Sequence, residues 1–181
     1  MKANRHPAVL RVLHWAIAAL IVAALVLGTF VMAPLPNSDP AKVFALGKHM
    51  AAGVLLVALS LVRLVVRPRT RRLAPVLTGM VWADWIVPLV HRVFDALALA
   101  MVVSGIGIAL ACGLPAIVFG GHGRLPASFD GLAMHTLHVL VARVLAGFVA
   151  LHVGGALYHH FVLRDGLLSR MSLGRSARNR A

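Results

Sequence analysis

Four histidines lie inside long apolar runs of this 181-residue sequence, and their spacing indicates that they act together. They are His14, His49, His138 and His152. An ionisable side chain in a membrane-spanning segment is costly, so by default it is a candidate for function. His138 and His152 are fourteen residues apart, close to four helical turns, which places them on one helix face about 21 Å apart. One helix therefore offers two imidazoles at two depths of a hydrocarbon core about 30 Å thick.

The composition is that of a membrane protein. Hydrophobic residues make up 60% of the chain and charged residues only 13%, whereas about a quarter of a soluble domain is charged. The formal net charge is +13, from 18 Lys and Arg against five acidic residues. A nucleic-acid-binding protein carries such charge on a soluble face, but here it lies mostly at the ends of apolar runs. We therefore expect contact with membrane lipid and none with nucleic acid.

Four apolar segments are each long enough to cross a bilayer as a helix. They cover approximately residues 9–33, 43–66, 82–112 and 132–163, and predict an all-α, integral membrane four-helix bundle that forms one domain over 1–181. Lys and Arg are concentrated before the first segment, after the second and after the fourth. The opposite loops hold only Lys42, Lys48 and Arg124. By the positive-inside rule, both termini are predicted to be cytoplasmic.

This topology sorts the four histidines into two levels. His14 and His152 fall near the cytoplasmic side, whereas His49 and His138 fall near the outer side. Two pairs of neutral imidazoles at two depths suit two six-coordinate b-type haems. Cys112 is the only cysteine, so a covalent Cys-x-x-Cys-His attachment is excluded and the haems would be non-covalent.

Other interpretations of the histidines stay open at this point. A membrane histidine is often an interhelical hydrogen-bonding group. A zinc site would gather three or four ligands in one place, and a proton relay usually adds carboxylates, for which Asp95 is the clear candidate. A haem-free proton or metal transporter is therefore an alternative function. His135 and His91 are the alternative outer and inner ligands if the haem interpretation holds.

Arg63 and Gly28 repeat the same fourteen-residue spacing. Arg63 follows His49 on the same face near the inner level, where it either pairs with a haem propionate or extends to the cytoplasmic interface. Gly28 follows His14 and passes near the outer level, where it serves either the approach of a macrocycle or helix packing.

His159 is the candidate for substrate chemistry. It follows His152 by seven residues, almost two turns, and so points in roughly the same direction near the cytoplasmic interface. An imidazole there can hydrogen-bond a quinone carbonyl and relay its proton. His160 is less favourably phased.

Over nearly its whole length the sequence resembles the bacterial cytochrome b561 family, the four-helix, di-haem type of the cytoplasmic membrane. The matching motifs are Leu13-His14-Trp15, Gly47-Lys48-His49-Met50-Ala51-Ala52-Gly53, the Arg63 and Arg67 pair, Leu137-His138, Leu151-His152 and His159-His160-Phe161. The resemblance implies a bacterial inner-membrane oxidoreductase that passes electrons to or from ubiquinone, in some members with superoxide as donor. It also implies that His14 and His152 ligate the inner haem, and His49 and His138 the outer one.

By the same resemblance, His159 matches a position beside the quinone. Family members often carry a lysine near the quinone in the segment between the second and third helices, and this chain has none there. Arg71 and Arg72 are the substitutes that we consider. An alternative function is a haem-bearing membrane anchor for a partner dehydrogenase, since related cytochromes serve that role.

Overall fold

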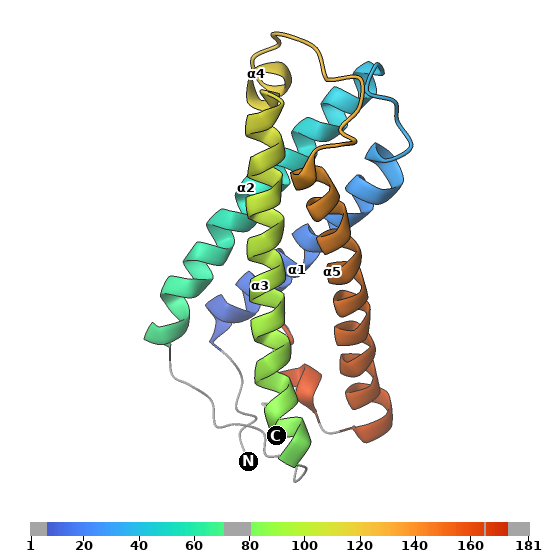
Figure 1. Ribbon diagram of the computed structural model, residues 1–181. Coiled ribbons are helices and arrows are strands. Elements are labelled where there is room, and N and C mark those ends of the chain that lie inside the picture. The colour runs from blue at the N-terminus through green and yellow to red at the C-terminus, as the bar shows by residue number, and fades with distance from the viewer. Residues whose placement is uncertain (1–6, 71–80, 165, 174–181) are drawn as a thin grey trace.

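The computed structural model describes residues 7–70, 81–164 and 166–173, and every regular element in those ranges is a helix (Figure 1). Its four long elements are α1 Ala8–Val26 continued by η1 Leu27–Met32, α2 Pro40–Arg69, α3 Val81–Ala111, and α5 Ala133–Tyr158 continued by η2 His159–Leu163. Two short elements complete it, α4 Leu114–Val118 and η3 Leu167–Arg170. By length and composition, all four long helices can cross a membrane. The predicted all-α membrane four-helix bundle is confirmed.

The ends of α2 show where local capping extends a helix beyond its apolar core. The helix begins at Pro40 because the Asp39 side chain accepts a hydrogen bond from the Ala41 amide at 2.8 Å, while proline suits the first helical position. At the other end α2 continues through Pro68, which the sequence placed after the helix. The Arg69 side chain donates to the Val65 carbonyl oxygen. The Thr70 hydroxyl donates to the Arg67 carbonyl oxygen in the last turn, where carbonyls lack intrahelical donors.

Lys42 fastens the beginning of α2 to the end of η1. Its side chain is buried, and Nζ donates to the carbonyl oxygens of Met32 at 2.5 Å and Leu35 at 2.9 Å. A cation is favourable at a helix C-terminus because the last carbonyls there have no intrahelical partners. This single side chain therefore holds the turn between the first two membrane helices.

The bundle is organised as two helix pairs. α1 packs against α2, and α3 packs against α5. In the described part of the chain, the backbones of α1 and α2 do not pack extensively along α5. The beginning of α1 and the end of η2 lie at one end of the bundle, with α4 and the turn after η1 at the other (Figure 1). That the first of these is the cytoplasmic end stays a prediction.

The segment after η2 returns to the beginning of α1. Trp15 Nε1 donates to the Met171 carbonyl oxygen at 2.8 Å, and Arg11 donates to the carbonyl oxygen of Ser172. Trp15 therefore joins two segments that lie far apart in the sequence.

Candidate functional site

His49 of α2 and His138 of α5 face each other between the two helix pairs. Their ring centroids are 6.1 Å apart and the ring planes are inclined by 75°. Among the described residues, the buried His49 Nδ1 has no hydrogen-bond partner. His135, the alternative outer ligand, instead places its ring 5.8 Å from that of Phe129. The structure thus brings His138, rather than His135, opposite His49.

Ser104 of α3 is a polar neighbour of this pair that sequence reasoning missed. Its side chain is fully buried, and its Oγ lies 2.9 Å from His138 Nδ1. The same hydroxyl donates to the Ala100 carbonyl oxygen at 2.7 Å. The only signal in the sequence was a hydroxyl within an otherwise apolar run.

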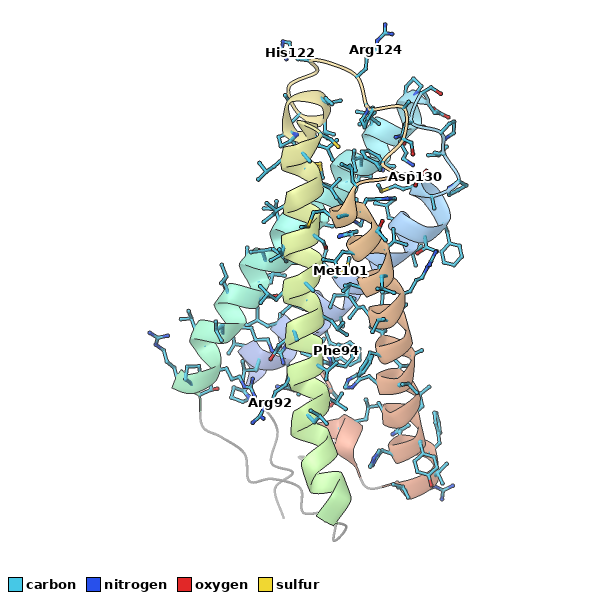
Figure 2. All side chains as sticks on the ribbon, in the orientation of Figure 1. Arg92, Phe94, Met101, His122, Arg124 and Asp130 are labelled. Carbon is cyan, nitrogen blue, oxygen red and sulfur yellow. The ribbon has the colours of Figure 1, made fainter. Side chains whose placement is uncertain are left out.

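His14 of α1 and His152 of α5 form the second facing pair. Their ring centroids are 6.4 Å apart and the planes are inclined by 64°. Phe94 of α3 lies edge-on to His152, with 5.4 Å between centroids, and also to Phe148 at 6.0 Å. Figure 2 shows the Phe94 ring between α3 and α5. Sequence reasoning missed Phe94 because an aromatic residue in an apolar helix is ordinarily a packing residue.

Both separations fit two imidazoles on opposite sides of one iron. A bond from a metal to an imidazole nitrogen is about 2 Å long, so two such rings have centroids roughly 6 Å apart once the ring radius is added. Each pair presents two imidazoles, and a six-coordinate b-type haem takes two such ligands. Among the described residues, no group of three or more His, Cys, Asp or Glu side chains is gathered as for a metal ion.

Glycines flank both rings of the His49–His138 pair. A Cβ placed on Gly28 would lie 3.6 Å from His49 Cε1, and a Cβ on Gly105 would lie 3.4 Å from His138 Cε1. A side chain larger than a methyl group at either position would therefore compete with the ring for space. The backbone therefore packs closely beside both rings, and the lack of a side chain on either glycine permits this approach.

Two further predicted residues that the structure describes, Arg63 and His159, lie towards the end of the bundle where α2 and η2 finish. Arg63 lies on α2 and is partly buried. His159 is the first residue of η2 and is also partly buried, with its ring centroid 6.3 Å from that of Tyr158. His160 is exposed. Arg71 and Arg72 lie outside the described residues.

The seven-residue spacing predicts the direction of His159 relative to His152 only if the chain between them is regular α-helix. It is α-helical through Tyr158. From His159 the chain widens into the π-helix η2, and single π turns are frequent at functional sites. His159 is partly buried and His160 is exposed, and the role of either residue towards a quinone stays a prediction.

A four-helix membrane bundle with two facing histidine pairs at different depths is typical of a membrane cytochrome of the b type. The chain belongs to the prokaryotic cytochrome b561 family, which it matches over residues 5–174. It is also similar to a probable superoxide oxidase, CybB, of Yersinia pestis. The two are 28% identical over 133 residues, which cover 68% of this chain and 72% of that protein. The family resemblance seen in the sequence is confirmed, and membership implies a multi-pass bacterial membrane protein that binds haem b.

Proposed function

We propose that this protein is a di-haem oxidoreductase of the bacterial inner membrane, which passes electrons between the outer face and ubiquinone. His14 and His152 hold the inner haem, and His49 and His138 hold the outer one. The observation that carries the proposal is the presence of two facing pairs with centroid separations of 6.4 Å and 6.1 Å. When bound, two haems at two depths supply one-electron transfer across the bilayer.

The chain contributes ligand geometry through α5, which carries one histidine of each pair. Because His138 and His152 are four turns apart on one face, α5 fixes the axial separation of the two levels at about 21 Å. The partner histidines come from two separate helices, α1 and α2, which pack against each other. The turn held by Lys42 therefore sets the relative heights of His14 and His49.

His159 is proposed to act on the quinone rather than on iron. Reduction of a quinone to a quinol takes up two protons with two electrons, and an imidazole titrates near neutral pH. The partly buried ring of His159 can hydrogen-bond a quinone carbonyl oxygen and deliver a proton to it. Arg71 and Arg72 are further quinone candidates, and Arg63 is proposed to pair with a propionate of the inner haem.

Superoxide is proposed as the electron donor on the basis of the name of the Yersinia pestis relative. Its oxidation to dioxygen releases one electron, so two superoxide ions are consumed for each ubiquinone reduced to ubiquinol. The purified protein should oxidise enzymatically generated superoxide and reduce a soluble ubiquinone analogue in that ratio. If the protein is instead an anchor, a dehydrogenase subunit will copurify with it and the isolated chain will leave both substrates unchanged.

Haem content tests the ligand assignment directly. A pyridine haemochrome assay should give two b haems per chain. His14→Ala and His152→Ala should each lose the same haem, and His49→Ala and His138→Ala the other, whereas the control His135→Ala should keep both. One haem or none in the unmodified protein contradicts the proposal, as does loss of the same haem in the His14→Ala and His49→Ala variants.

A further inference from the structure

We infer that Ser104 is a positioning residue for the outer haem, because its hydroxyl fixes the tautomer of His138 and lowers the reduction potential of the iron that this histidine ligates. The inference rests on the proposed ligation by His49 and His138. Ser104 itself does not contact iron in this scheme, because it acts on the nitrogen of His138 that faces away from the metal.

The number of hydrogen atoms on the hydroxyl determines the direction of this hydrogen bond. Ser104 Oγ carries one hydrogen and lies within donor distance of two carbonyl oxygens, those of Ala100 at 2.7 Å and Met101 at 3.1 Å. A serine in a helix commonly donates to the carbonyl of the preceding turn. With its hydrogen used in that way, Oγ can only accept at the 2.9 Å contact with His138 Nδ1. Nδ1 is therefore the protonated nitrogen, and Nε2 keeps the lone pair that an iron ligand requires.

The surroundings hold the His138 ring in this orientation. Ser104 is fully buried, so water cannot reach its hydroxyl and replace the contact. The adjacent Gly105 brings the backbone of α3 against the same edge of the ring, because a Cβ there would be only 3.4 Å from Cε1. Helix α3 supplies no haem ligand in the proposed scheme, yet it fixes the ring by a hydrogen bond at Nδ1 and by close packing at Cε1.

The hydrogen bond has an electronic effect as well as a geometric one. A ligating imidazole that donates its second N–H to an acceptor becomes a more basic ligand. Greater basicity stabilises the ferric over the ferrous state and so lowers the reduction potential. Removal of such a partner typically weakens metal binding by about 10–100-fold. If the loss falls on the ferric state, each factor of ten raises the potential of a one-electron couple by about 59 mV.

Redox titration of the full-length protein in detergent, followed in the haem absorption bands, tests the inference. Ser104→Ala should keep two haems but raise the reduction potential of one of them by about 59 mV. This shift corresponds to a tenfold weaker binding of the ferric state. Ser104→Thr keeps a hydroxyl and should restore the original value. Ser60→Ala, at an exposed position of α2, is the matched control and should change neither potential.

Two ligand-variant backgrounds show which haem responds. In His14→Ala, which retains the outer haem, Ser104→Ala should still raise the potential. In His49→Ala, which retains the inner haem, it should have no effect. Loss of the outer haem alone in Ser104→Ala would also support the inference, as a stronger form of the same effect.

Unchanged potentials in Ser104→Ala with both haems present overturn the inference and leave the proposed function standing. A shift confined to the inner haem, loss of both haems, or failure of Ser104→Thr to restore a lost property also overturns it. An unmodified protein that binds no haem overturns the proposed function itself, and this inference with it.

Discussion

On the proposed ligand assignment, replacement of Lys42 by methionine should destabilise the outer haem site without changing a proposed ligand. Lys42 lies seven residues before His49 on α2, so the two are about two turns, or roughly 10 Å, apart on nearly the same face. The Nζ contacts with Met32 and Leu35 fix the height of this face relative to η1, which contains Gly28. Methionine has a similar volume but cannot donate to either carbonyl oxygen. The hydrogen bonds that fix the position of α2, and so of His49, relative to η1 are therefore lost.

The magnitude follows from the two hydrogen bonds and their cost. Hydrogen bonds to a charged group contribute about 1.5–3 kcal/mol each. Burial of the ammonium, only 7% of whose residue is exposed, opposes this gain by several kcal/mol. We expect a net loss of about 2 kcal/mol, because the two carbonyls lose their donor while the desolvation cost is removed. For a chain of this length, that loss lowers the Tm by about 4–8 °C.

The assay is thermal unfolding of the haem-loaded protein in detergent, followed by helical circular dichroism and by haem absorbance. Lys42→Met should release the outer haem first on heating. Lys48→Met is the control, because the Lys48 side chain is exposed and lies 4.1 Å from the Phe44 ring centroid. Such an exposed cation–π contact contributes only about 0.5–1 kcal/mol. Equal Tm values for the two variants would refute the anchoring role of Lys42.

Three further predictions concern the opposite end of the bundle. His159→Ala should keep both haems but slow quinone reduction by about 10²–10⁴-fold, as expected for loss of a general acid. His160→Ala should slow it much less, and equal rates in the two variants would argue against a role for His159. Phe94→Ala should weaken retention of the inner haem, measured by transfer to apomyoglobin, while the outer haem is retained as before; an equal effect on both haems would contradict the observed packing. Trp15→Phe removes the donor to the Met171 carbonyl, so limited proteolysis should cut faster near the end of the chain at a cost of about 1 kcal/mol in stability; unchanged cleavage would show that this contact does not hold the segment.

Several features of this protein were predictable because they depend on local sequence alone. The length of an apolar run determines whether a helix can cross a bilayer, so the four long helices follow from composition. Helical periodicity places His138 and His152 on one face without knowledge of any neighbour. Successive membrane helices run in opposite directions, which places His14 at the level of His152 and His49 at the level of His138. The structure brings the same partners together. That these pairs ligate haem remains a prediction.

Tertiary structure alone decided which residues surround the histidines. The contact of Ser104 with His138 joins positions 34 residues apart, and it depends on how α3 is rotated and shifted against α5. Sequence periodicity fixes the face of a helix but not the rotation of its neighbour, because many apolar faces pack with similar energy. The same rotation places Phe94 against His152. The sequence could therefore predict the helices and the levels of the histidines, whereas the packing of α3 on α5 determined the environment of each ring.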